Sequence, residues 1–286
     1  MIDTDNYAAA GIEVIWLPAG EPHVKMKAFE VPHVHMYAKL RNSEDVLAFL
    51  AVCSALEHQG VDRHVFMPYL PGGRQDRVQS NGCFTAQMFA RLLTPAVTTL
   101  TAIDIHSDAA AMAYGKELPL HVLPLEPIVK NLLKTTPTTY DALIIPDAGA
   151  VPRGESLAKY LGIKEIIYCT KRRDSDTGEV IVESFPDEWV MDGLNRLLLA
   201  DDICDGGGTF LQIADQIHAF NSDMQIDLFV THGIFSKGFD LIDERFNHIF
   251  TTDSFFRLTE EQSNKASQTP KSWSNLFYAY TESLTP

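Results

Sequence analysis

Residues 197–220 read LLLADDICDGGGTFLQIADQIHAF, and this stretch sets the fold class of the chain. Leu197–Ala200 is an apolar run of the kind found in strands that are buried on both faces. After three glycines, apolar residues recur at helical spacing: Phe210, Ile213, Ala214, Ile217 and Phe220. The stretch predicts a buried strand, a glycine turn and a helix, which is the repeating unit of an α/β fold with mostly parallel sheets.

The glycine turn carries the chemistry of this unit. Glycines let backbone N–H groups approach an anion closely, and a helix N-terminus favours negative charge. Carboxylates beside the turn suit sugar hydroxyls or a hard cation. The stretch therefore predicts a site for a phosphorylated sugar; the alternative is an ordinary turn with a solvated acidic rim. Asp201 and Asp202 would face the sugar, and the phosphate cradle would comprise Asp205, Gly206, Gly207, Gly208 and Thr209.

Composition excludes several classes of function. The chain has 286 residues, of which 45% are apolar, enough for one large or two medium domains. Its formal net charge of −15 argues against a nucleic-acid-binding or anionic-membrane-binding surface. No apolar stretch is long enough to span a bilayer, and the acidic start at Met1–Tyr7 is unlike a secretory signal. The four cysteines lack Cys-x-x-Cys spacing, so we expect free thiols and a cytoplasmic protein.

Strands and helices alternate along the chain, and the alternation restarts after the Pro/Thr-rich connector Thr135–Tyr140. We therefore predict two similar α/β domains, residues 1–135 and 136–286, with a tail after residue 254 that packs back on the first domain through Trp273, Phe277, Tyr278 and Tyr280. The predicted strands are Ile12–Leu17, Val65–Leu70, Val97–Ile103, Leu118–Val122, Ala142–Ile145, Lys164–Cys169, Gln225–Val230 and, as the last, Asn247–Thr251. The first predicted helix is capped by Asn42 or Ser43, runs through His58 and stops at Gly60. The other predicted helices are Phe84–Leu93, Pro124–Lys134 and Pro152–Leu161.

Three histidines, His23, His33 and His35, alternate with apolar residues in an N-terminal segment. The alternation favours a strand. Their spacing fits no standard metal cluster, and no acidic residue stands where it would support one, so we expect structural histidines here.

Polar loops follow several predicted strands, at the edge where open parallel sheets bind ligands. Val65–Leu70 runs into Arg74-Gln75-Asp76-Arg77, whose arginines can pair with a polyphosphate. Asp104-Ile105-His106 follows the strand ending at Ile103, and Asp147 follows Ile145. Lys171-Arg172-Arg173 lies at the base of a predicted hairpin and would bring cations over a phosphate. Taken singly, each of these loops is also compatible with a solvated turn.

Together and in this order, these motifs resemble those of the ribose-phosphate pyrophosphokinases, over about Asn42 to Gly238. That family has two tandem phosphoribosyltransferase-type domains and moves the diphosphoryl group of ATP to the C1 hydroxyl of ribose 5-phosphate with Mg²⁺. The resemblance implies roles for this chain's residues. Phe29, Arg74, Gln75, Asp76 and Arg77 would bind ATP; Lys171, Arg173 and His106 would be catalytic; His106 and Asp147 would hold the metal; and the acidic pair and the cradle would bind the ribose phosphate.

Two departures from the family pattern bear on specificity. The family's Phe-Ser-Asp-Gly-Glu segment, whose acids read adenine, aligns with Phe29-Glu30-Val31-Pro32-His33, which lacks both acids. The family's phosphate loop, Asp-Thr-Ala-Gly-Thr, is Asp205-Gly206-Gly207-Gly208-Thr209 here, so that a hydroxyl and a methyl group are missing. The roomier loop suits a substituted 5-phosphate, such as that of ADP-ribose.

The sequence therefore predicts a Mg²⁺-dependent diphosphokinase with ATP as donor and ribose 5-phosphate as acceptor, in a homo-oligomer of at least two subunits. ADP-ribose, as in a route of NAD salvage, is the alternative acceptor. Two further hypotheses are a type I phosphoribosyltransferase, against which the Arg74–Arg77 loop argues, and an inactive regulatory subunit of a synthetase assembly, against which Lys171 and Arg173 argue.

Overall fold

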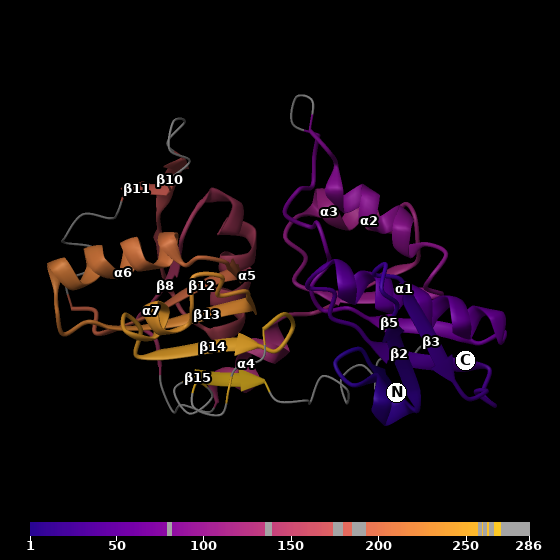
Figure 1. The fold of residues 1–286 in the computed structure, drawn as a ribbon. Coiled ribbons are helices and arrows are strands. Elements are labelled where there is room, and N and C mark those ends of the chain that lie inside the picture. Colours follow the sequence, from indigo (N-terminus) through magenta and orange to yellow (C-terminus); the bar gives the residue numbers. More distant parts are fainter. Residues whose placement is uncertain are drawn as a thin grey trace. The chain divides into compact units, whose positions relative to one another are not determined.

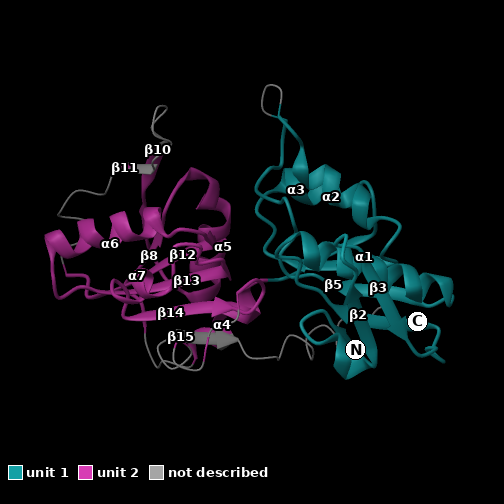
Figure 2. Ribbon diagram, viewed as in Figure 1, with its two compact units in different colours: residues 1–124, 272–286 teal, residues 125–271 magenta. Residues whose placement is uncertain are grey.

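A computed structural model describes residues 1–78, 82–134, 139–173, 180–184, 193–256, 259, 262 and 266–269. The chain forms two compact units, the first from Met1 to Pro124 and the second from Leu125 to Lys271 (Figures 1 and 2). This division falls ahead of residue 135, where the composition of the connector placed it. Most of that connector, and the tail residues Trp273, Phe277, Tyr278 and Tyr280, lie outside the described residues.

Unit 1 is a parallel sheet with helices packed on it. The strand order is β1-β4-β5-β6-β7, and every neighbouring pair is parallel. The strands are β1 (Ile2–Asp3), β4 (His33–Tyr37), β5 (Asp62–Phe66), β6 (Thr99–Ile103) and β7 (Leu120–Leu123), and the helices are η1 (Tyr7–Ala10), α1 (Ser43–His58), α2 (Thr85–Leu93) and α3 (Asp108–Gly115). A separate antiparallel hairpin joins β2 (Ile12–Trp16) to β3 (Pro22–Met26).

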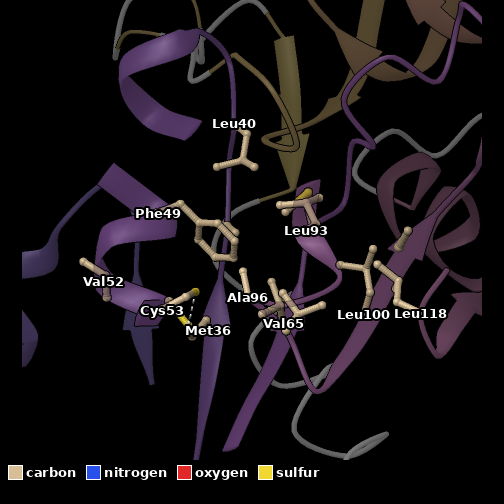
Figure 3. Packing of buried hydrophobic residues seen from close by; sticks show 14 of the residues in the cluster. Met36, Leu40, Phe49, Val52, Cys53, Val65, Leu93, Ala96, Leu100 and Leu118 are labelled. Atoms are coloured by element: carbon tan, nitrogen blue, oxygen red, sulfur yellow. Dashed lines mark hydrogen bonds between the residues drawn. The ribbon is translucent and has the colours of Figure 1, made fainter. Parts of the chain in front are cut away.

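Helix α1 forms where the sequence predicts it. The side chain of Asn42 caps the helix by accepting a hydrogen bond from the backbone N–H of Asp45. Gly60 follows the helix with a positive φ of 73°, which glycine adopts without steric cost. One face of α1 buries Phe49, Val52 and other apolar side chains against the sheet, and this packing forms the core of unit 1 (Figure 3).

Unit 2 is a second parallel sheet, of order β15-β14-β13-β12-β8-β9. Its strands are β8 (Ala142–Ile145), β9 (Glu165–Tyr168), β12 (Arg196–Cys204), β13 (Gln225–Gly233), β14 (His248–Thr252) and β15 (Ala266–Thr269). Its helices are α4 (Glu126–Leu133), η2 (Ala148–Ala150), α5 (Val151–Leu161), α6 (Gly208–Phe220) and α7 (Asp240–Asp243). The central strands are buried on both faces, as their continuous apolar sequences predict. An antiparallel hairpin of β10 (Thr170–Arg173) and β11 (Val180–Ser184) follows β9.

Several predicted boundaries are wrong. The strand predicted at Val65–Leu70 is β5 and ends at Phe66; the chain still runs beside β6 as far as Pro68, but proline has no N–H to donate to a ladder. Asp201 and Asp202 lie within β12 rather than in the loop after it. Asn247–Thr251 is not the last strand, because the polar segment β15 pairs with β14. Helix α3, which begins after the Ser107 cap, was not predicted.

The described residues contain no helix that is both apolar enough and long enough to cross a membrane. All four cysteines are free thiols.

Three histidines of unit 1 lie together on neighbouring strands. His33 and His35 are on β4 and His64 is on β5, and the centroids of the three rings are 5.4 to 5.6 Å apart. Burial, and then the nearby His64 and His33, lower the pKa of His35 to about 4. No group of three or more histidine, cysteine, aspartate or glutamate side chains among the described residues is arranged to hold a metal ion.

This cluster predicts acid sensitivity of unit 1. Because the pKa of His35 is lowered in the folded protein, the unfolded chain binds a proton at His35 that the folded protein does not. Neutral His35 therefore stabilises the fold above the ordinary histidine pKa, and this stabilisation is lost as the pH falls toward 4. We expect the free energy of unfolding to fall over that range in the wild type and less so in His35→Asn, measured by denaturant titration at each pH. His58→Gln, at the exposed end of α1, is the control. Parallel curves for the wild type and His35→Asn would contradict the prediction.

Candidate active site

The glycine turn joins β12 to α6. Gly207 has a positive φ of 77°, and α6 begins at the next residue, Gly208. In the first turn of this helix, the backbone N–H of Leu211 donates to the carbonyl of Gly207. A Cβ on Gly207 would stand 2.2 Å from Cδ1 of the buried Ile242, so a larger residue requires Ile242 to shift as well as adopting the positive φ that favours glycine. The turn thus places unobstructed backbone N–H groups at the N-terminus of a helix, where an anion is favoured.

Gly207→Ala should therefore destabilise unit 2. Overpacking costs about 1–3 kcal/mol and a left-handed non-glycine residue adds about 1 kcal/mol, so we expect a loss of about 2–4 kcal/mol in the free energy of unfolding. Gly208→Ala is the stability control, because its Cβ would meet nothing within 4 Å and its φ is not positive. Denaturant titration measures both; equal stabilities for the two variants would contradict the close approach of Ile242.

The acidic pair lies just before the turn, at a point where β12 extends past its partner β8. Asp201 is 8% and Asp202 4% exposed, and the backbone N–H of Asp202 donates to Oδ1 of Asp201 at 2.8 Å. Burial, and then the adjacent Asp202 carboxylate, raise the pKa of Asp201 well above its ordinary value, while Arg153 opposes the rise. Two buried carboxylates side by side are costly, so their retention here points to a ligand or a cation partner.

Lys171 and Asp147 meet within unit 2. The Nζ of Lys171, on the first strand of the hairpin, lies 2.5 Å from Oδ2 of Asp147. The other oxygen of Asp147 accepts hydrogen bonds from the backbone N–H groups of Gly149 and Ala150, and so caps η2 at the end of β8. A candidate catalytic cation and a candidate metal ligand are thus in direct contact. Arg173 ends β10.

The loop after β5 forms the candidate nucleotide site of unit 1. Asp76 is 9% exposed; its carboxylate accepts hydrogen bonds from Ser107 Oγ at 2.5 Å and from Arg77 Nε at 3.3 Å. Burial alone would raise the pKa of Asp76, but these hydrogen bonds outweigh it, and the pKa lies below its ordinary value. The Gln75 side chain accepts a hydrogen bond from Thr85, the first residue of α2. Arg74 is exposed.

His106 lies beside this loop in the structure. It immediately precedes Ser107, which bonds Asp76, and it is exposed at the end of β6, the strand next to β5. Asp104 in the same segment has a positive φ of 42°, uncommon outside glycine. Phe29 packs against the core of unit 1 as a partly buried side chain, and its backbone N–H donates to the side chain of Gln59.

Two cations of unit 2 were not predicted as site residues. Arg153 of α5 forms ion pairs with both Asp201 and Asp202. The aliphatic stem of Lys237 lies 3.2 Å from where a Cβ of Gly206 would stand, and the preceding Ser236 donates to Asp205. Both residues come from segments that no motif marked; their place follows from the parallel sheet, which brings the ends of β8, β12 and β13 to one edge.

Known proteins resemble the chain in sequence. A ribose-phosphate pyrophosphokinase from Maricaulis maris (strain MCS10) is 30% identical over 238 residues, 81% of this chain and 73% of that protein. A protein of the same name from Pyrococcus abyssi is 25% identical over 247 residues, 85% of this chain and 84% of the relative. Another, from Sulfurisphaera tokodaii, is 28% identical over 191 residues, 66% of this chain and 64% of the relative. No protein-family model matches the chain.

The fold is shared as well. The crystal structure of phosphoribosylpyrophosphate synthetase from Mycobacterium smegmatis superposes with a TM-score of 0.75 at 19% identity, over 96% of this chain and 91% of that one. The α/β architecture with parallel sheets, of phosphoribosyltransferase type, is thereby confirmed. The similarity to the Maricaulis maris protein, which extends over most of both chains, shows that this chain is a divergent member of the ribose-phosphate pyrophosphokinase family of enzymes.

Proposed function

We propose that the protein transfers the diphosphoryl group of ATP to the C1 hydroxyl of ribose 5-phosphate, releasing AMP. The C1 oxygen forms a bond to the β-phosphorus, the bond between that phosphorus and the AMP oxygen breaks, and the hydroxyl proton is released. The observation that carries the proposal is the buried Asp201–Asp202 pair, which runs directly into the glycine turn at the start of α6. Carboxylates that accept from sugar hydroxyls, next to an anion cradle, fit a ribose with a 5-phosphate.

Charged side chains suit the donor half of the reaction. Diphosphoryl transfer needs positioning and neutralisation of charge more than covalent chemistry. Lys171 would stabilise charge on the transferring phosphoryl group, and the loop from Arg74 to Arg77 would hold the phosphates of ATP. The hydrogen bond from Ser107 holds the side chain of Asp76 in place. Asp76 lies between Arg74 and Arg77, so the loop is anchored close to both exposed arginines.

Mg²⁺ is part of this proposal. Proteins bind Mg²⁺ through one or two carboxylates together with substrate phosphates, so the carboxylate of Asp147 fits such a site without a cluster of protein ligands. Within unit 1, we propose His106 as a separate candidate metal ligand. When bound, the ion would neutralise charge on the ATP phosphates. We also propose that the protein acts as a homo-oligomer of at least two subunits, which light scattering in solution tests.

The lysine beside Gly206 favours a second acceptor, ADP-ribose. A threonine at this position, as in the family's loop, would place its Cβ 3.2 Å from the Lys237 stem, closer than most such contacts. Glycine leaves that space to the lysine, whose ammonium group lies one bond beyond a stem carbon that touches the cradle. A cation beside the cradle suits an acceptor whose 5-phosphate carries a second phosphoryl group.

Incubation with ATP, Mg²⁺ and either ribose 5-phosphate or ADP-ribose, followed by measurement of AMP, tests the proposal. AMP formed with ribose 5-phosphate supports the main proposal, and a higher kcat/KM with ADP-ribose supports the second acceptor. No AMP with either acceptor would refute both. Release of pyrophosphate from phosphoribosyl pyrophosphate only when a base is added would favour a phosphoribosyltransferase instead.

A further inference from the structure

Arg153 reaches both members of the buried acidic pair. Its Nη1 lies 3.7 Å from Oδ1 of Asp201 and its Nη2 lies 3.5 Å from Oδ2 of Asp202. The side chain is 17% exposed and comes from the first turn of α5, the helix that follows β8. One planar guanidinium therefore meets two carboxylates through different nitrogens. Because the guanidinium fork is rigid, this arrangement orients both carboxylates relative to one another.

The surroundings of the pair make this cation necessary. Adjacent buried carboxylates repel each other, and without an opposite charge one of them keeps its proton. On the neighbouring strand β13, the residue paired with Asp201 is the uncharged Val230. On the pair's own strand, burial raises the pKa of the Cys204 thiol to about 12, so this group is neutral at working pH. Arg153 on α5 thus opposes the effect of Asp202 on Asp201.

The protonation state decides what the pair can bind. An ionised carboxylate only accepts hydrogen bonds, whereas a protonated one also donates. Sugar hydroxyls donate well to ionised carboxylates, and a fixed orientation of the acceptors reduces the entropy lost on binding.

We propose that Arg153 is the positioning residue of the acceptor site, holding the carboxylates of Asp201 and Asp202 in a fixed orientation so that they accept hydrogen bonds from the ribose hydroxyls. This inference rests on the proposed function. Arg153 acts through the carboxylates and not on the reacting atoms. The competing interpretation is that Arg153 only stabilises the fold, as a buried ion pair between a helix and a strand.

The test compares Arg153→Met and Arg153→Lys with Lys159→Met, an exposed cation two turns along the same helix. We expect Arg153→Met to raise the KM for the acceptor at least about tenfold, as for a lost hydrogen bond to a charged group, and to leave the KM for ATP nearly unchanged. The acid limb of the kcat/KM profile for the acceptor should move to higher pH, because the pKa of the pair rises without its cation. Arg153→Lys should recover part of both effects, and Lys159→Met should resemble the wild type. An unshifted acid limb, or equal increases in both KM values, would overturn the proposal.

A measurement of stability against pH, which needs no enzyme activity, tests the proposal even if the variant is inactive or less stable. A raised carboxyl pKa gives stability that is lost as the pH rises through it, so removing Arg153 should cost more stability near pH 7 than near pH 4. We expect the difference in denaturation midpoint between Arg153→Met and the wild type to widen over that range, and a constant difference would overturn the proposal. A wild-type protein that releases no AMP would refute the proposed function, which is a separate result.

Discussion

Lys171→Ala should lower kcat for AMP release by about 10²–10³-fold, as expected when one donor is removed from a preorganised electrostatic site. The Lys171 ammonium group pairs with Asp147 at the carboxyl edge of the unit 2 sheet. The Asp201–Asp202 pair lies in the carboxyl-terminal half of β12, so its strand runs to the same edge of the sheet. If the lysine stabilises charge that develops during transfer, its loss lowers kcat and kcat/KM together and changes the KM for the acceptor much less.

The fold should not suffer from this substitution. Asp147 keeps its hydrogen bonds from the backbone N–H groups of Gly149 and Ala150, and the lysine side chain is 32% exposed. An ion pair this exposed contributes at most about 1 kcal/mol to the free energy of unfolding. Steady-state kinetics and a denaturant titration of the same variant therefore separate catalysis from stability.

Arg172→Ala is the matched control. Arg172 is the next residue of the same strand, so its side chain points to the opposite face, and it is also exposed. We expect a change in kcat of less than about threefold, as for a charge that does not touch the reacting atoms. A loss of activity as large as that of Lys171→Ala would mean that the hairpin acts through its net charge, and normal activity of Lys171→Ala would exclude the lysine from the reaction.

Sequence patterns predicted well those elements whose signals are local. The strand at Ala142–Ile145 agrees with the structure at both ends, because four apolar residues stand between the charged Asp141 and Pro146, which cannot donate to a ladder. The Asn42 cap and Gly60 delimit α1, because both act through their own backbone neighbourhood. The edge strand β15, in contrast, has the polar sequence ASQT, and only its pairing with β14 makes it a strand. Long-range pairing leaves no mark on a short polar segment.

The same distinction applies to the candidate site. Glycines after a buried strand predict the glycine turn from the sequence, since the requirement for a positive φ at Gly207 is local. Arg153 could not be identified in this way. It lies in an ordinary amphipathic helix, 48 residues before the first carboxylate that it meets, and only the adjacency of β8 and β12 brings them together. Lys237 could not be identified from the sequence for the same reason, because its segment follows β13 and meets the glycine turn only through the pairing of β12 with β13.

Arg196→Met should cost about 3–5 kcal/mol of the free energy of unfolding of unit 2, as expected when a buried ion pair loses one partner. Asp227 has no exposed surface, and its carboxylate is held by Arg196 through Nε at 3.1 Å and Nη2 at 2.7 Å. The Tyr140 hydroxyl donates to the same carboxylate at 2.7 Å, and His248 Nδ1 lies 3.2 Å from it. This network joins β12, β13 and β14 at their amino-terminal ends, away from the candidate site.

A double variant distinguishes the cost of an unpaired charge from the net value of the pair. Replacing both partners with apolar residues, as in Arg196→Met with Asp227→Leu, removes the uncompensated carboxylate and should be less destabilising than Arg196→Met alone. Arg245→Met is the control, since its pair with Asp215 is exposed and contributes at most about 1 kcal/mol. Hydrogen exchange of the β13 amides reports unit 2 without assuming that the two units unfold together. If the double variant were less stable than Arg196→Met alone, the Asp227 carboxylate would not be destabilising without its arginine, and its contacts with Tyr140 and His248 would account for the stability instead.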